Sequence, residues 1–73
     1  MAVHDPDYQR FLARLRQARL DAQLTQVAVA RQLGKPQSFV AKCESGDRRV
    51  DVVELLWFAR IYEKPIGWFV DEG

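Results

Sequence analysis

The stretch from Thr25 to Gly46 constrains the fold of this chain more than any other part of the sequence. It reads TQVAVARQLGKPQSFVAKCESG. Thr25 can cap the start of a helix with its hydroxyl oxygen, and Gly34 suits the left-handed residue that follows a helix end. Pro36 then suits the first turn of a second helix, which Gly46 ends. Two short helices joined by so tight a turn must cross at a steep angle, so the stretch predicts a helix-turn-helix.

Apolar residues at helical spacing give both predicted helices an inward face. These residues are Val29, Ala30 and Leu33 in the first helix and Val40 and Cys43 in the second. The only cysteine of the sequence therefore falls on an inward face. We expect it to serve core packing and to have no redox role, because a buried thiol in apolar surroundings is normally inert.

An amphipathic helix is predicted before this stretch. Either Asp5 or Asp7 can act as its N-cap, and the pattern continues to about residue 22. The apolar stripe of this helix consists of Tyr8, Phe11, Leu12, Leu15 and Ala22. Three arginines lie off the stripe and are expected in solvent: Arg10, Arg14 and Arg16.

Two more helices are predicted after the central stretch. Asp51 can cap a helix that ends at about residue 62, and Glu54 three residues later completes a capping box. We expect its inner face to consist of Val52, Leu55, Leu56, Ala59 and Tyr62, with Phe58 between the faces. A short last helix is predicted from Pro65 to about Val70, since proline is tolerated in a first turn.

Length and residue usage indicate one small domain, residues 1–73. Residues 1–6 show little periodicity and are expected to form a loose leader, with His4 in solvent. A single cysteine fits a reducing compartment. No apolar run approaches the length of a membrane span, and the N-terminus lacks a signal-peptide core. We therefore expect a cytoplasmic protein without membrane contact.

The charge of the chain is small in total but uneven in distribution. The formal net charge is +1. Residues 25–49 hold five basic and two acidic residues, whereas residues 50–73 hold two basic and five acidic residues. Positive charge therefore gathers on the helix-turn-helix and the loop after it, where a phosphate backbone would lie. A solvated face of mixed charge is the competing interpretation.

The central stretch resembles the Xre/Cro family of lambda-repressor-like DNA-binding domains. The residues that carry the resemblance, in order and spacing, are Thr25-Gln26, Val29-Ala30, Leu33-Gly34, Pro36-Gln37-Ser38, Val40 and Glu44-Ser45-Gly46. The likeness extends from about Phe11 to about Phe69. It implies a compact, all-α, five-helix domain whose helix-turn-helix, at about residues 25–45, binds double-stranded DNA.

The resemblance also implies roles for polar residues around the helix-turn-helix. An arginine at the position of Arg19 tends to pair with the glutamate that ends the second helix, here Glu44. The side-chain amide of Gln26 would contact a DNA phosphate and support Gln37. From the residues alone, Arg19 and Glu44 are also compatible with two surface charges, and Gln26 with an ordinary exposed glutamine.

Gln37, Ser38 and Lys42 are the candidates for reading DNA bases, because they face away from the inward side of their helix. A glutamine near the start of a helix in the major groove can bond adenine N6 and N7 at once. Ser38 permits close approach to the bases, and Lys42 can reach a guanine edge or a phosphate. Phe39 packs between helices or touches a thymine methyl group, and its size favours packing.

Phosphate contacts are expected from residues that flank these base readers. The candidates are Gln26, Lys35, Arg48 and Arg49. The N-terminus of the helix that follows Arg49 is a second candidate phosphate site, because free backbone N–H groups there favour an anion.

The helix after the exit loop carries more apolar surface than one small domain can bury. Hydrophobic residues make up 48% of the chain. Val53, Trp57 and Ile61 recur at four-residue spacing on a second side of this helix, so it is apolar nearly all round. We expect one contiguous patch and a homodimer with Trp57, Ile61 and Trp68 at its interface. Alternatively, Trp68 and Phe69 fold over Trp57 and close a monomer core.

The function that these features favour is sequence-specific DNA binding by a transcriptional regulator, expected to be a repressor that binds an inverted repeat as a homodimer. The alternative is a protein-interaction module of the same fold, an antitoxin or adaptor, that binds a partner protein through its aromatic C-terminal face. One histidine, one cysteine and no glycine-rich phosphate loop offer no catalytic set, so no enzyme activity, cofactor or metal site is expected.

Overall fold

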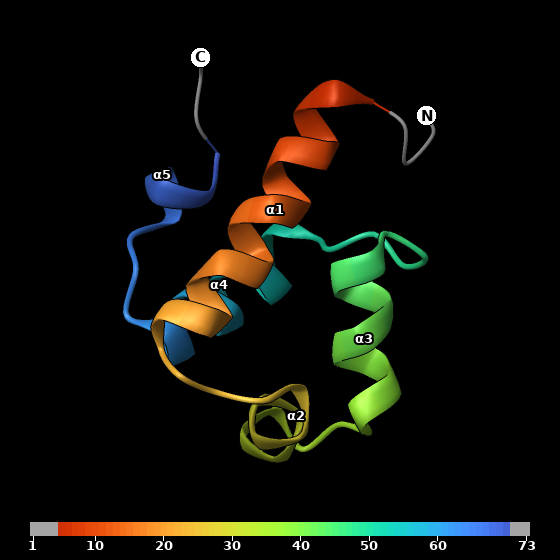
Figure 1. The fold of residues 1–73 in the computed structure, drawn as a ribbon, viewed down its shortest axis with the longest axis vertical. Helices are drawn as coiled ribbons and strands as arrows, with labels where there is room; N and C mark the ends of the chain where they lie inside the picture. The colour runs from red at the N-terminus through yellow and green to blue at the C-terminus, as the bar shows by residue number, and fades with distance from the viewer. Residues whose placement is uncertain (1–4, 71–73) are drawn as a thin grey trace.

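The computed structural model describes residues 5–70, which form five α-helices and no strand. The helices are α1 (Pro6–Asp21), α2 (Gln26–Leu33), α3 (Gln37–Ser45), α4 (Val52–Tyr62) and α5 (Ile66–Phe69), as labelled in Figure 1. The expected all-α, five-helix architecture is confirmed. His4 and most of the predicted leader lie outside the described residues, whereas Asp5 and Pro6 already belong to the start of α1.

Capping side chains define where the helices begin. The Asp5 carboxylate accepts hydrogen bonds from the backbone N–H groups of Asp7 and Tyr8, so Asp5, of the two candidates, is the N-cap of α1. The Thr25 hydroxyl accepts from the N–H of Ala28 at 3.1 Å and starts α2. Asp51 caps α4, and the predicted capping box with Glu54 is complete. α3 begins one residue after Pro36, which is its N-cap and makes no side-chain capping bond.

Left-handed glycines end both helices of the helix-turn-helix, as predicted. Gly34 follows α2 with φ 68°, and Gly46 follows α3 with φ 88°. A side chain raises the free energy of this backbone conformation, which glycine adopts without strain. The turn between α2 and α3 therefore has only three residues, 34–36, and the two helices are forced to pack closely on each other.

The helix α1 packs against α3, α4 and α5, and α2 joins the bundle through α3 and α4. Figure 1 shows α1 crossing in front of α4, with α3 on one side and α5 on the other. The core between them contains six side chains with no exposed surface: Leu15, Ala18, Val29, Val40, Cys43 and Phe58. Phe69 of α5 is also buried, so the C-terminal helix helps to close this core, which is one part of the monomer alternative.

The predicted inner face of α4 is wrong at Val52 and at Phe58, and Leu56, also predicted there, is only half-buried. Val52 is 73% exposed, while Phe58 is fully buried. The buried apolar residues Leu55, Phe58, Ala59 and Tyr62 recur at intervals of three, one and three, which is one compact helical stripe. Val52 occupies the first turn of α4, and its side chain falls outside this stripe.

Arg14 of α1 also departs from its expected place in solvent. Its guanidinium donates a hydrogen bond to the backbone carbonyl of Trp68 and lies 5.3 Å from the centre of the Trp68 ring. The side chain is half-buried. Arg14 therefore attaches α5 to α1, an interaction with no local sequence signal because the two residues are far apart in the chain.

Candidate DNA-binding surface

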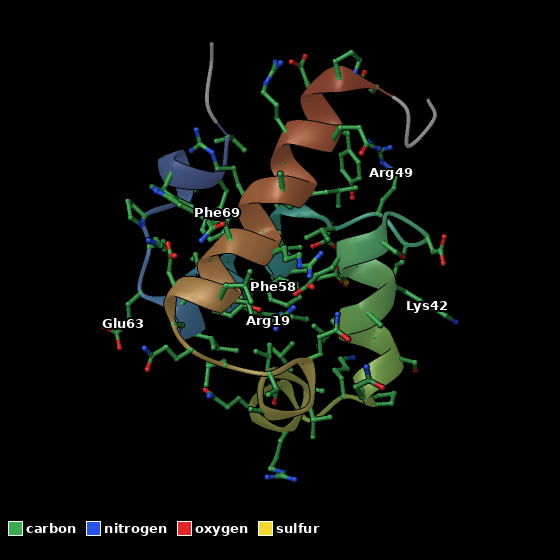
Figure 2. The ribbon with its side chains drawn as sticks, viewed as in Figure 1. Arg19, Lys42, Arg49, Phe58, Glu63 and Phe69 are labelled. Atoms are coloured by element: carbon green, nitrogen blue, oxygen red, sulfur yellow. The ribbon has the colours of Figure 1, made fainter. Side chains whose placement is uncertain are left out.

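The outward side of α3 presents the three residues expected to read bases. Gln37, Ser38 and Lys42 are exposed, while Val40 and Cys43 on the opposite side have no exposed surface. Figure 2 shows Lys42 pointing away from the body of the domain on the α3 side. The amphipathic pattern of this short helix thus orients its polar residues toward solvent, where they can meet a partner.

A continuous set of polar contacts links the start of α3 to the interior. The Gln37 amide nitrogen donates to the Gln26 side-chain oxygen at 2.8 Å, and the Gln26 amide nitrogen donates to Glu44 Oε1 at 3.1 Å. Glu44 also accepts from Arg19, with Nε to Oε2 at 2.7 Å and Nη2 to Oε1 at 3.2 Å. We refer to Arg19, Glu44, Gln26 and Gln37 as the Arg19 network. It runs through α1, α2 and α3, and so connects three helices.

The carboxylate of Glu44 determines the orientation of both glutamine amides. A carboxylate only accepts hydrogen bonds, so the NH₂ group of Gln26 must face Glu44. The oxygen of Gln26 then faces Gln37, which must present its own NH₂ group in return. The side-chain oxygen of Gln37 and one of its amide hydrogens remain for another partner.

The Arg19–Glu44 ion pair is largely withdrawn from water. The side chains are 11% and 6% exposed, and Arg19 also donates to the backbone carbonyl of Leu24 at 3.0 Å. The hydrogen bond with Glu44 raises the pKa of Arg19. Figure 2 shows Arg19 inside the domain. The structure therefore contains the pairing that the resemblance implied, and its burial distinguishes it from two independent surface charges.

Two of the expected phosphate ligands, Lys35 and Arg49, are exposed cations with aromatic neighbours. The Lys35 ammonium lies 5.4 Å from the centre of the Phe39 ring and 6.0 Å from that of Trp57. The Arg49 guanidinium lies 4.3 Å from the centre of the Tyr8 ring. Such contacts orient a cation while leaving its N–H donors open. In Figure 2, Arg49 lies on the same side of the domain as Lys42.

Arg48 differs from these two cations because its guanidinium makes three hydrogen bonds within the protein. Its Nη1 donates to Glu54 Oε1 at 2.7 Å and to the Arg49 carbonyl at 3.1 Å, and its Nη2 donates to Glu54 Oε2 at 2.6 Å. The hydrogen bond with Glu54 raises the pKa of Arg48, and the hydrogen bond with Arg48 lowers the pKa of Glu54. This geometry argues against the phosphate role expected for Arg48.

The N-terminus of α4 is also a poor phosphate site. The Glu54 carboxylate accepts the N–H of Asp51, and the Asp51 carboxylate accepts the N–H of Glu54. The two acidic side chains take up backbone donors that an anion would need and repel negative charge. The capping signal was visible in the sequence, but its consequence for phosphate binding was missed.

Phe39 packs between helices, the alternative that its size favoured. Its ring stacks on Phe58 of α4 with centres 6.4 Å apart, and the Arg48 guanidinium lies 4.7 Å from its centre. The side chain is half-buried.

One exposed cation beside the surface was not among the predicted site residues. Arg16 of α1 lines an open cleft of about 290 Å³ together with Gln26, Ala41 and Ser45, and the Arg19–Glu44 pair forms the rest of its wall. The sequence signal was available, because Arg16 lies one helical turn before Arg19 and so emerges from α1 on the same side.

The three residues expected at a dimer interface do not form a single patch. Trp57 and Ile61 line a groove of about 340 Å³ between α4 and the end of α2, flanked by Lys35 and Arg60. Trp68 instead lies between Arg14 of α1 and Lys64, whose Nζ is 4.3 Å from the centre of its ring. All three side chains are half-buried.

The described residues contain no other constellation with obvious chemistry. Burial raises the pKa of the Cys43 thiol, which agrees with a packing role. Residues 5–70 bring together no group of three histidine, cysteine or acidic side chains suited to a metal ion. None of the helices in this part of the chain combines the length and apolar character needed to cross a membrane.

Comparison of the sequence with known protein families also identifies a helix-turn-helix domain. The sequence matches the family profile of a helix-turn-helix domain over residues 10–65, which includes α2, α3 and α4 in full. A search among curated proteins finds no match. Because the profile covers most of the chain, the protein belongs to an Xre-like family of helix-turn-helix domains, and this membership indicates DNA binding.

Proposed function

We propose that the protein is a sequence-specific transcriptional regulator, a repressor, that inserts α3 into the major groove of double-stranded DNA. The observation that carries the proposal is the position of Gln37. This exposed side chain stands in the first turn of α3, and a buried ion pair orients it through Gln26. A glutamine at the start of a helix can read a base. Because this side chain is already oriented, it loses less conformational entropy when it binds DNA.

The atoms that Gln37 leaves free match one edge of adenine. Its side-chain oxygen can accept a hydrogen bond from adenine N6, and its second amide hydrogen can be donated to N7. Ser38 and Lys42 on the same exposed side of α3 read neighbouring positions. Such a contact discriminates against the other bases by about 1–3 kcal/mol.

Cations and amides around α3 supply the phosphate contacts in this proposal. Lys35 and Arg49 are exposed on its two flanks, Arg16 lies beside the cleft near Gln26, and Gln26 itself keeps one free amide hydrogen. These groups give affinity and register without reading sequence.

We propose a homodimer that brings two copies of α3 to successive major grooves. Val53, Trp57 and Ile61 form an outward stripe on α4, of which Val53 is 53% exposed. This stripe is the proposed dimer interface. Trp68 lies outside it, between Arg14 and Lys64. A two-fold dimer binds half-sites about 34 Å apart, so the operator is an inverted repeat. Occupation of such a site in a promoter would exclude polymerase.

Selection from a random DNA library tests the proposal. The protein is incubated with the library, bound fragments are sequenced, and the mass of the free protein is measured in solution. We expect enrichment of a short inverted repeat and the mass of two chains. Bound fragments that show no sequence preference over the input library would contradict specific regulation.

The substitution Trp57→Glu tests the interface. It should give a folded monomer with weakened affinity for the selected repeat, because a carboxylate would be placed in an apolar contact. Trp68→Glu is the matched control and should leave the dimer intact. A Trp57→Glu protein that remains dimeric would place the interface elsewhere.

A second candidate function, binding of a partner protein, follows from the groove between α4 and the end of α2. Trp57 and Ile61 between Lys35 and Arg60 also suit an acidic, apolar segment of a different protein, as in an antitoxin or adaptor. A monomeric mass together with unspecific DNA binding would favour this function over the regulator.

A further inference from the structure

We propose that Arg48 is a positioning residue for DNA reading: it joins α3 to the first turn of α4 and thereby sets the orientation of the recognition helix. The proposal rests on the DNA-binding function proposed above. It assigns Arg48 to sequence discrimination, whereas an exposed basic residue in this loop would ordinarily contribute charge to non-specific affinity.

Arg48 contacts two residues in α3 and one in α4. Its backbone N–H donates to the carbonyl of Lys42 in α3 at 3.2 Å. Its guanidinium makes two hydrogen bonds to the carboxylate of Glu54 in α4, and its Cζ atom lies 4.7 Å from the centre of the Phe39 ring in α3. We call this arrangement the Arg48 bridge. A two-point contact of this kind needs the planar fork of arginine, which lysine cannot reproduce.

The bridge lies on the side of α3 that faces α4, where few other contacts hold the helix. The helix packs chiefly on α2 and α1, and it meets α4 through the stack of Phe39 on Phe58. The Arg48 bridge holds this stack from the loop side, because the guanidinium covers the Phe39 ring. Phe39 follows Gln37 and Ser38 directly in the first turns of α3, so a shift of its ring moves both base-reading side chains.

The partner of Arg48 is itself well defined. Glu54 is 7% exposed and is held by the capping box with Asp51. Removing Arg48 therefore leaves a buried carboxylate without its counter-charge, and the first turn of α4 must rearrange to hydrate it. The neighbouring Arg49 has no such attachment to Glu54 in the described contacts, and it serves as the internal comparison.

Binding measurements on four proteins test the proposal. The wild type, Arg48→Lys, Glu54→Gln and Arg49→Ala are titrated with the selected inverted repeat and with random DNA at several salt concentrations. Circular dichroism identifies a temperature at which every variant is folded. Arg48→Lys keeps the charge but loses the two-point contact, whereas Glu54→Gln leaves Arg48 intact, removes the anion that holds it and also weakens the capping box with Asp51.

We expect Arg48→Lys and Glu54→Gln to lower the ratio of specific to random affinity roughly five- to tenfold, the lower end of the loss of one base contact, with an unchanged salt slope. Arg49→Ala should weaken both kinds of DNA and reduce the slope by about one phosphate contact per half-site. A purely structural residue would lower the melting temperature and leave the ratio unchanged. The proposal is overturned if Arg48→Lys keeps the ratio, or if Glu54→Gln tightens binding to both DNAs by releasing Arg48.

If the protein prefers no DNA sequence, amide hydrogen exchange of the free protein tests whether Arg48 positions α3. Loss of the bridge should speed exchange in α3 about tenfold relative to α1 in Arg48→Lys, because α3 opens locally. Equal exchange in wild type and variant would overturn the positioning role. Absence of sequence preference in the wild type itself would count against the DNA-reading function and not against the bridge.

Discussion

Two arginine–glutamate pairs support α3, the proposed recognition helix, and they differ in what surrounds them. Arg19–Glu44 joins residues 25 positions apart, and both side chains are nearly buried, at 11% and 6% exposed. Arg48–Glu54 joins residues six positions apart, and its arginine is 40% exposed. The first pair holds the end of α3 and, through Gln26, orients Gln37. The second pair holds the loop after α3 and places its guanidinium over the ring of Phe39.

The difference shows how similar chemistry can serve two purposes. A buried pair costs much to desolvate, and its value lies in the partners that it orients, here Gln26 and through it Gln37. In the second pair only the glutamate is buried, so desolvating the partly exposed arginine costs less, and that arginine can still bridge two elements. In the proposed arrangement, the first pair orients Gln37 at the start of α3, and the second holds Phe39 on the side of the same helix.

The largest effect should follow from removing the buried pair. Arg19→Ala leaves the Glu44 carboxylate buried without its counter-charge, so we expect the free energy of unfolding to fall by about 3–5 kcal/mol. Urea denaturation measures this loss. Arg16→Ala, one turn earlier on the same helix, is the control and should change stability by less than about 0.5 kcal/mol. A loss in Arg19→Ala as small as that in the control would mean that Arg19 and Glu44 form an ordinary surface contact.

The second pair should give a smaller loss that depends on pH. Glu54→Gln removes one charged partner and weakens the capping box, so we expect a loss of about 1–2 kcal/mol at neutral pH. Urea denaturation over a series of pH values measures it. Glu63→Gln, an exposed glutamate just after the same helix, is the control and should have little effect.

The pH dependence follows from the direction of the Glu54 pKa shift. The Arg48 hydrogen bond lowers this pKa below its ordinary value of 4.5. The stabilisation is therefore fully present above the unfolded-state pKa and is lost as pH falls below it through the folded-state pKa. The difference between wild type and Glu54→Gln should narrow in acid below about pH 4.5. If the difference in free energy of unfolding stays constant down to low pH, the ionisation of Glu54 does not contribute to stability.

The smallest effect concerns a hydroxyl group near the buried pair. Tyr62 lies close enough to Glu44 and Arg19 to interact electrostatically, and burial raises its pKa, so the hydroxyl stays protonated. This hydroxyl is buried without a hydrogen-bond partner among the described residues. Tyr62→Phe should therefore keep or raise the free energy of unfolding, by up to about 1 kcal/mol in thermal or urea unfolding. A clear loss of stability would show that the hydroxyl contributes a bond to the network.

Helix starts, and the ends marked by glycine, could be predicted from the sequence because their signals are local. The caps Thr25 and Asp51 and the glycines 34 and 46 act within a few residues of themselves. The C-cap of α4 carried no such signal, since Glu63 adopts a left-handed conformation with φ 56°. Local hydrogen bonds accompany this conformation, since the N–H groups of Glu63 and Lys64 donate to the carbonyls of Arg60 and Ala59, but no residue type marks it in the sequence.

The candidate site could be predicted in its exposed residues and only partly in its contacts. Periodicity alone directs Gln37, Ser38 and Lys42 outward, because Val40 and Cys43 must be buried. Arg48 and Arg49 look alike in the sequence, and their different partners depend on the loop path, which the left-handed Gly46 and the Arg48–Lys42 backbone bond establish. The division of the aromatic residues into two surfaces depends in the same way on where α5 packs.

Repeating the library selection with Gln37→Ala tests most directly whether α3 reads DNA through the Arg19 network. Each protein is selected in parallel from the same random library, and the enriched motifs are compared position by position. We predict that the variant loses a preference for adenine at one symmetric position in both half-sites, while preferences elsewhere persist and affinity for the wild-type repeat falls by about 1–3 kcal/mol. An unchanged motif, or an equal loss of affinity for all DNA, would contradict base reading by Gln37.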